Sequence, residues 1–322
     1  MAAIWLNEAD IRGVLSGGAL TDVIADALAG FSAGNVDQPV RTALEIAERS
    51  FFGLMPAFER GQALFGAKLV TVVPGNAGRG LPTHQAVIAL FHAATGSLAG
   101  LLDGRYITEA RTAAASAVSV RHMARADSAV LAVLGSGVQA ASHFEALCRE
   151  RHFRDVRVWS PTPQHLEEFV RGRPCARAAH SAAEAVSGAD VVVVATSSVT
   201  PAIENAWVAA GTHVIAIGAC RPSQREVDGA LMARSRLVVD SREAALVEAG
   251  DVVQSIREGR FTAEHVAAEL GEVVSGARAG RTTSDEVTLF KSLGLAIEDL
   301  TAAQLAYRLA REQGLGQVLE ER

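Results

Sequence analysis

Cysteines and long apolar runs are scarce in this sequence, and both absences bear on where the protein works. The three cysteines form no CxxC pair and leave an odd number (Cys148, Cys175 and Cys220), which favours a reducing compartment. No run approaches the ~20 apolar residues that cross a membrane, and residues 1–10 have neither the basic start nor the apolar core of a signal peptide. We therefore expect a cytoplasmic protein with no membrane association.

Metal-ligand spacing and concentrated positive charge are missing as well. The nine histidines are dispersed without an HxxxH or HExxH spacing, so we predict no metal site. The net charge is −6 and the positive residues are scattered, which argues against a nucleic-acid partner. Hydrophobic residues make up 49% of the chain, which excludes disorder, and 322 residues exceed one typical domain, so two domains are expected.

An apolar run leads directly into a glycine-bearing turn at residues 135–140. Residues 129–134 read as a buried strand, residues 135–140 match the pattern G-x-G-x-x-A, and residues 141–147 read as an amphipathic helix. Gly135 would allow the tight turn, Gly137 would let the backbone approach a pyrophosphate, and Ala140 would let the helix pack closely. We predict a dinucleotide site; the alternative is an ordinary strand–turn–helix whose glycines serve only the turn.

The arrangement of elements predicts an α/β protein. Residues 8–31 read as a helix broken at Gly17-Gly18, and short branched or aromatic runs read as strands of one sheet at 39–44, 51–57, 63–73, 85–92 and 96–103. Thr108 is a plausible N-cap for an alanine-rich helix. Valine-rich and isoleucine-rich runs at 156–159, 191–195, 213–217 and 236–240 predict a doubly wound parallel sheet in a domain of residues 112–293. A last helix, 295–311, is expected to return to the first domain.

Three cations occupy positions where cations are costly. Lys68 lies in an otherwise apolar strand, Arg41 is predicted within a strand, and Arg111 is predicted in the first turn of the alanine-rich helix, where it would oppose the helix dipole unless an anion is near. Guanidinium groups can grip a carboxylate, and a lysine can bind an anion or relay a proton. The alternative is that Lys68 reaches water from an edge strand and that both arginines pair with acids at the surface.

Several short motifs are spread nearly from end to end of the chain: QPVRT (38–42), MPA (55–57), KLV (68–70), PTHQ (82–85), ITEARTAA (107–114), LGSGVQA (134–140) and FKSLGLA (290–296). Together they resemble the ornithine cyclodeaminase/mu-crystallin family. The segments RP (221–222), VDSREAA (239–245) and EAGDV (248–252) make the chain more similar to the mu-crystallin, or ketimine reductase, branch. The resemblance implies a homodimer and a Rossmann domain (112–293) inserted in an α+β substrate-binding and dimerisation domain (1–111 plus 294–322).

The resemblance also implies a set of site residues. Arg41, Lys68 and Arg111 would surround the substrate carboxylate and carry the chemistry, with Met55 and Cys220 as further substrate contacts and Thr83 and His84 as possible helpers. Phe52, Met55 and Val72 are apolar candidates for contact with the substrate side chain. The expected cofactor contacts are Thr83, Arg111, Thr112, Gly135, Ser136, Gly137, Val138, Gln139, Ser160, Thr162, Ala195, Thr196, Ile217 and Ser292.

Two departures from the family pattern bear on the reaction. Cyclodeaminases of this family have an aspartate where this chain has Cys220, and a thiol is a poor substitute for a carboxylate base. This favours imine reduction over cyclodeamination and leaves Asp228, in the following segment, a structural role. At the end of the second Rossmann strand, Ser160-Pro161-Thr162 offers neither an acid for the NAD ribose nor an arginine for the NADP phosphate, which leaves both cofactors open with a slight preference for NAD.

The sequence thus predicts an NAD(P)H-dependent reductase of small 2-imino acids. Three alternatives remain open within the resemblance: ornithine or lysine cyclodeamination, alanine dehydrogenation, and non-catalytic binding of a small ligand as in mu-crystallin.

Overall fold

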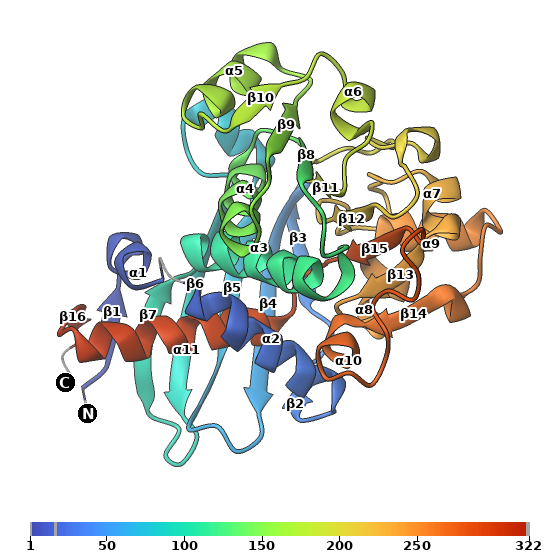
Figure 1. Ribbon diagram of the computed structural model, residues 1–322. Coiled ribbons are helices and arrows are strands. Elements are labelled where there is room, and N and C mark those ends of the chain that lie inside the picture. The colour runs from blue at the N-terminus through green and yellow to red at the C-terminus, as the bar shows by residue number, and fades with distance from the viewer. Residues whose placement is uncertain (1, 16–17, 320–322) are drawn as a thin grey trace. The chain divides into compact units, whose positions relative to one another are not determined.

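The computed structural model describes residues 2–15 and 18–319, which form two compact units (Figure 1). The first unit comprises Met1–Arg111 and Leu295–Arg322, and the second comprises Thr112–Gly294. The second unit is therefore inserted in the sequence of the first. Each unit is built on its own β-sheet.

A mixed sheet of eight described strands forms the framework of the first unit. The spatial order is β16-β1-β7-β6-β5-β4-β2, with β3 also paired to β4, and β1–β7 is the parallel pair in an otherwise antiparallel arrangement. The strands are β1 (Ile4–Leu6), β2 (Val36–Asp37), β3 (Thr42–Ala47), β4 (Ser50–Glu59), β5 (Leu64–Val72), β6 (His84–His92), β7 (Leu98–Asp103) and β16 (Gln317–Val318).

Helices pack on one face of this sheet. α11 (Ala296–Glu312) contacts β4, β5 and β6 as well as α2 (Ala19–Ser32), and α1 (Glu8–Val14) contacts α11 and β7 (Figure 1). Because side chains alternate along a strand, one row across the strands faces these helices and is buried: Met55, Lys68, Ile88 and Leu102.

The helical prediction for residues 8–31 is confirmed by α1 and α2, although Gly17 of the predicted break lies outside the described residues. The glycine-rich loop after β5 contains a 3-10 helix, η1 (Pro74–Arg79). Among the described residues, no single helix is long and apolar enough to cross a membrane, and α1 with α2 reaches that length and hydropathy only as a bent pair.

The second unit is built on a sheet of eight described strands that are all parallel. Their order is β10-β9-β8-β11-β12-β15-β13-β14, so the chain proceeds outward on either side of β8, as in doubly wound folds. The strands are β8 (Val130–Leu134), β9 (Asp155–Trp159), β10 (Ala176–Ala178), β11 (Val191–Val194), β12 (His213–Ala216), β13 (Arg236–Val239), β14 (Val266–Glu269) and β15 (Thr288–Lys291). The predicted α/β class with a doubly wound parallel sheet is confirmed.

Helices connect these parallel strands. α3 (Gly104–Met123) begins in the first unit and continues into the second. The others are α4 (Val138–Glu150), α5 (Pro163–Arg171), α6 (Ala182–Val186), α7 (Gly229–Arg234), α8 (Arg242–Glu248), α9 (Gly250–Arg257) and α10 (Leu270–Val274), with 3-10 helices η2 (Asn205–Trp207) and η3 (Ala263–His265). A core of small and branched apolar residues, including Ala132, Val192 and Val214, lies along the strands.

Three strands of the second unit were not predicted. β10 and β14 consist largely of alanine, and β15 has a polar residue at each end, so none of them shows a branched apolar run like those of β11, β12 and β13, which are equally short. β15 nevertheless lies inside the sheet, between β12 and β13. Its position therefore follows from tertiary packing and not from local pattern.

Candidate active site

Lys68 is a buried lysine in the middle of the first unit's sheet. It lies in β5, between β4 and β6, and its side chain is 2% exposed. Its register partners are Met55 on β4 and Ile88 on β6. The alternative of an edge-strand lysine that reaches water is wrong, because β5 has a neighbour on each side. A buried ammonium requires a partner charge.

Two adjacent carboxylates in the first turn of α11 supply that partner. Asp299 Oδ2 lies 2.5 Å from Lys68 Nζ, and Asp299 Oδ1 accepts a hydrogen bond from Arg111 Nε at 2.9 Å. Glu298 Oε2 accepts one from Arg111 Nη1 at 2.8 Å. Both carboxylates are fully buried. Arg111 does pair with acids, but in the interior and not at the surface.

Arg111 extends from the interior of α3 and not from its first turn. The helix begins at Gly104, where the Arg105 N–H donates to Asp103 Oδ1 at 2.9 Å. The prediction of Thr108 as N-cap is wrong, because its hydroxyl donates to the Gly104 carbonyl at 2.8 Å within the helix. The alanine-rich composition starts one turn after the helix itself does. The charge of Arg111 is balanced by α11 carboxylates and does not oppose a helix terminus.

Burial and neighbouring charges set the protonation states in the cluster. Burial lowers the pKa of Lys68 to about 8; Asp299 opposes this shift, while Arg111 and Arg41 add to it. Burial, helped by the charge of Lys68, lowers the pKa of His84 to about 4, so its imidazole is neutral at neutral pH. Burial acts to raise the pKa of Asp299, but Arg111 and Lys68 outweigh it and the pKa is lowered. Lys68 and Asp299 thus form an ion pair at neutral pH.

The other predicted residues of the first unit are placed around Lys68. Arg41 is half-buried and stands one residue before β3, so its predicted position within a strand is wrong by one residue, and its charge acts on Lys68. Thr83 is exposed and immediately precedes β6, whose first residue, His84, shares the face of Lys68. Met55 is buried beside Lys68.

The three apolar candidates divide between the two faces of the sheet. Met55 and Val72 share the face of Lys68, whereas Phe52 lies on the opposite face with Thr71. Within the first unit, only Met55 and Val72 of these three are therefore oriented like the cluster.

In the second unit, the two glycines of the turn after β8 serve different purposes. Gly135 has φ +122°, and a Cβ there would lie 2.4 Å from the Ala195 carbonyl oxygen, so only glycine fits. Gly137 is the N-cap of α4 with φ −81°, makes no side-chain cap, and a Cβ there would meet nothing within 4 Å. The open space before the N–H groups of α4 fits a pyrophosphate.

The remaining predicted cofactor contacts of the second unit lie near the carboxyl ends of the parallel strands, where doubly wound sheets bind ligands. The Ser136 hydroxyl donates to Ser160 Oγ at 2.8 Å, which joins the ends of β8 and β9. Thr162 is the N-cap of α5 and makes no side-chain cap. The others are Val138 and Gln139 in the first turn of α4, Ala195 and Thr196 after β11, Ile217 after β12 and Ser292 after β15, whereas Thr112 lies on α3.

Cys220 lies half-buried in the turn after β12. Its thiol donates to the Ile217 carbonyl at 3.3 Å, and its N–H donates to Gln224 Oε1 at 3.1 Å. Asp228 is the N-cap of α7 and accepts from the Ala230 N–H, which confirms its structural role. The thiol is thus engaged with its own turn.

The buried acids were not predicted from the sequence. Glu298 and Asp299 carry a signal in hindsight, since an acidic pair stands in the first turn of an apolar helix where buried positions are expected. Two further acids of the second unit, Glu226 and Asp251, are also fully buried. Asp251 lies in the EAGDV segment, but no local pattern marks either acid as buried, because their partners come from other elements.

The fold and these residues define a class of protein: a two-unit α/β protein with a Rossmann-type parallel sheet and a buried cluster of cations and carboxylates. The family model for the ornithine cyclodeaminase/mu-crystallin family matches residues 3–314. The chain belongs to this family.

Several members of known activity are similar over nearly their whole length. The chain is 43% identical over 314 residues to the ketimine reductase mu-crystallin of Mus musculus, covering 95% of this chain and 97% of the relative. A Thermococcus litoralis Δ(1)-pyrroline-2-carboxylate reductase, solved with NADH and L-proline, has a TM-score of 0.94 and 34% identity over 98% of this chain and 100% of its own. An archaeal alanine dehydrogenase dimer with bound NAD has a TM-score of 0.95 and 30% identity, with full coverage of both chains.

Proposed function

We propose that this protein is an NAD(P)H-dependent reductase that converts small 2-imino acids into amino acids by hydride transfer to the imine carbon. The buried cluster of Lys68, Arg111, Glu298 and Asp299 carries the proposal, because it combines anion-binding groups with a lysine of lowered pKa. The ketimine and pyrroline-2-carboxylate reductases among its relatives support the reaction class.

In this proposal, Arg41, Arg111 and Lys68 bind the substrate carboxylate. Glu298 and Asp299 counter two of these three positive charges, so the five groups together retain one net positive charge. A single carboxylate on the substrate balances that charge, which favours a monocarboxylate. Met55 and Val72 offer apolar contact to its side chain. Holding the carboxylate fixes the position of the imine carbon next to it.

Reduction of a C=N bond consumes one hydride and one proton. A dihydronicotinamide, when bound, would supply the hydride to the imine carbon; the π electron pair of the C=N bond would then pass to nitrogen, where a proton completes the amine. Lys68, or a water that it orients, donates that proton to the nitrogen. A pKa of about 8 keeps most of Lys68 protonated at neutral pH while making its proton more acidic than that of an exposed lysine.

The turn after β8 and the carboxyl ends of β9, β11, β12 and β15 would hold the dinucleotide. Gly137 leaves room for the pyrophosphate. Ser160 and Thr162 follow the end of β9, which is where doubly wound folds bind the adenine ribose. We favour NADH over NADPH, because residues 160–163 contain no cation to pair with a 2′-phosphate.

The direct test is to mix the purified protein with Δ(1)-pyrroline-2-carboxylate or Δ(1)-piperideine-2-carboxylate and follow the absorbance of NADH and, separately, NADPH. We expect oxidation of the dinucleotide and formation of proline or pipecolate. Lys68→Ala should lose at least about 100-fold in kcat, the usual contribution of a positioned proton donor. Absence of oxidation with every imine and both dinucleotides would overturn the proposal.

The same assay separates the alternatives. Cyclodeamination of ornithine or lysine would release ammonia with no net change in NADH, and an alanine dehydrogenase would oxidise NADH with pyruvate and ammonia. A non-catalytic binding protein would show no turnover, and its affinity for ligand would survive the Lys68→Ala substitution.

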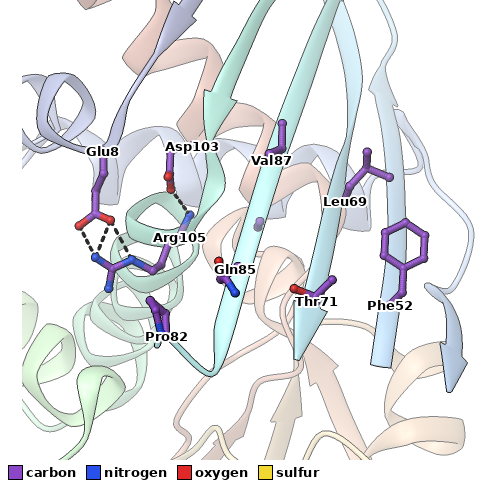
Figure 2. A pocket seen from close by; sticks show the side chains of 10 residues that line it. Glu8, Phe52, Leu69, Thr71, Pro82, Gln85, Val87, Asp103 and Arg105 are labelled. Atoms are coloured by element: carbon purple, nitrogen blue, oxygen red, sulfur yellow. Dashed lines mark hydrogen bonds and ion pairs between the residues drawn. The ribbon is translucent and has the colours of Figure 1, made fainter. Parts of the chain in front are cut away.

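We further propose that the first unit forms a homodimer through the sheet face opposite Lys68. Three large apolar side chains are exposed there: Leu44 (58%), Leu54 (39%) and Leu69 (40%). A shallow hollow continues this face, and Figure 2 shows Phe52, Leu69 and Thr71 at one side of it and the Glu8–Arg105 ion pair at the other. An apolar face of this extent is characteristic of an interface. The solved dimer of the archaeal relative supports a second copy as the occupant.

A further inference from the structure

One buried carboxylate links the carboxyl ends of two neighbouring strands in the second unit. Glu226 Oε1 accepts hydrogen bonds from the Thr196 N–H at 2.7 Å and the Thr196 hydroxyl at 2.8 Å, just after β11. Its Oε2 accepts from the N–H groups of Gly218 and of Ala219, the latter at 3.0 Å, just after β12. Four donors from two loops thus converge on one side chain that is fully buried.

Glu226 is itself held by a second buried acid. Asp251, on α9, accepts the N–H groups of Glu226 at 2.7 Å and Val227 at 2.9 Å. The other oxygen of Asp251 lies 3.3 Å from Lys291 Nζ, and Lys291 also donates to the Ala216 carbonyl at 3.4 Å. The ends of β11, β12 and β15 are therefore connected through one chain of buried charges.

Glycines allow these segments to approach one another. A Cβ at Gly218 would lie 1.8 Å from the Thr196 carbonyl oxygen and 2.6 Å from Glu226 Oε1. A Cβ at Gly250, beside Asp251, would lie 1.9 Å from the Gln224 carbonyl oxygen. Neither position has space for a side chain, so the backbone around Glu226 is fixed by packing as well as by hydrogen bonds.

We propose that Glu226 is a positioning residue that holds the loops after β11 and β12 in the conformation that binds the dinucleotide. This inference rests on the proposed function, because it requires a dinucleotide at this edge of the sheet. Thr196 and Ile217 are among the predicted cofactor contacts, and Glu226 bonds to Thr196 and to the residue that follows Ile217. A preorganised loop lowers the ordering cost that binding must overcome.

The position requires an ionised carboxylate. All four groups that face its oxygens are arranged as donors, and a carboxylate is the side chain that only accepts. Burial raises the pKa of Glu226 to about 7, against the opposing charge of Lys291, while the charge of Asp251 adds to the rise. Protonation as the pH falls below neutrality would place a hydrogen among these donors and loosen the two loops. Lys291 on β15 and Asp251 on α9 are the charged groups that act on Glu226, and Cys220, after β12, acts on Lys291.

The test measures dissociation constants for NADH, and in parallel for NADPH, by nucleotide fluorescence. Glu226→Gln should weaken binding of the favoured dinucleotide roughly tenfold, since an amide NH₂ would face two backbone donors. Glu226→Asp keeps the charge but is too short to reach both loops, and it should lie between Glu226→Gln and the unmodified protein. In the unmodified protein, affinity should fall as the pH is lowered from about 9 to about 6, and Glu226→Gln should flatten this dependence.

The matched control is Asp190→Asn. Asp190 also bridges two strands through backbone donors, accepting from the N–H groups of Ala129 at 2.8 Å and Val130 at 2.9 Å, but at the amino ends of β8 and β11. This variant should lower the melting temperature and leave the dissociation constants within about twofold.

Equal NADH affinity in Glu226→Gln, Asp190→Asn and the unmodified protein would overturn the inference while leaving the proposed function intact. If the protein binds neither NADH nor NADPH, both the inference about Glu226 and the proposed function are wrong. If Glu226→Gln does not fold, the pH series on the unmodified protein decides, and an affinity that is constant between about pH 6 and about pH 9 counts against the inference.

Discussion

Asp299 is the residue that allows a charged lysine inside the first unit. Lys68 and Asp299 are both buried, and removal of one partner from such a pair leaves an uncompensated charge in the interior. Asp299 also binds Arg111, so a single carboxylate orients two of the three proposed substrate cations. The protonation state of Lys68 therefore depends on one side chain of α11.

Substitution of Asp299 should change the pH dependence of catalysis. Because its charge raises the pKa of Lys68, Asp299→Asn should lower that pKa below about 8. The protonated lysine is the proposed acid, so kcat/KM for Δ(1)-pyrroline-2-carboxylate should fall as the pH rises through the pKa of Lys68. In the Asp299→Asn variant this decrease should occur at a pH lower by about one unit or more.

Glu298→Gln is the control for this experiment. Glu298 is equally buried and bonds to Arg111, whereas Asp299 is the carboxylate that forms the ion pair with Lys68. The Glu298→Gln substitution should reduce kcat/KM but should not change the pH at which kcat/KM decreases. If the pH profile shifts equally in both variants, or does not shift in Asp299→Asn, then Asp299 does not set the pKa of Lys68.

At this scale the sequence indicated the cations but not their partners. Lys68 was recognisable because a lysine in an apolar strand is unusual, and strand position is a local property. Arg111 and Asp299 are 188 positions apart, and their pairing depends on how α3 and α11 pack. The sequence thus suggested surface partners for the arginine where the fold provides buried ones.

The strand–turn–helix unit at residues 130–150 separates structural from binding requirements within one element. Gly135 is required by a positive φ and a close carbonyl, whereas Gly137 has an ordinary backbone conformation and open space around it. The two glycines of one pattern are therefore needed for different reasons.

Substitution of each glycine by alanine should distinguish those reasons. Gly135→Ala should destabilise the protein by about 1–3 kcal/mol, because φ is unfavourable and the new Cβ meets the Ala195 carbonyl. Gly137→Ala should change stability by less than about 1 kcal/mol. It should nevertheless weaken dinucleotide binding, because the methyl group would occupy the space left for the pyrophosphate.

Thermal unfolding and nucleotide fluorescence measure the two effects. If Gly137→Ala binds the dinucleotide as tightly as the unmodified protein, the space before α4 does not hold the pyrophosphate.

The predictable strands of the second unit were those with a run of branched apolar residues. β9, β11, β12 and β13 follow from branched apolar runs, and the start of α4 follows from the glycine pattern. β15 and the first turn of α3 were missed because neither has a distinctive composition. Both are set by contacts with other segments.

At the scale of the whole molecule, a single chain leaves an apolar face of the first unit exposed to water. Leu54 and Leu69 are register partners on β4 and β5, and each exposes more than a third of its surface. A protein that exposed this face permanently would be prone to association.

Leu69→Glu should therefore dissociate the proposed dimer. A charge at the centre of an apolar interface is not paired there, and its desolvation cost opposes association. Light scattering coupled to size exclusion should show the mass of a single chain. Val247→Glu is the control, because Val247 is exposed on α8 of the second unit, and it should leave the mass unchanged. A single-chain mass for the unmodified protein would contradict the dimer.

The order in which the chain is synthesised has a consequence for this fold. β15 lies inside the second unit's sheet, yet β13 and β14, which lie beyond it, are made first. The sheet therefore cannot be completed between β12 and β13 until residues 288–291 have been synthesised. The ion pairs of Lys68 and Arg111 form later still, because their carboxylate partners lie on α11, which is synthesised after β15. Neither sheet is complete, and neither cluster has all of its charged groups, before residue 291 has been made, so co-translational folding before that point stops at intermediates.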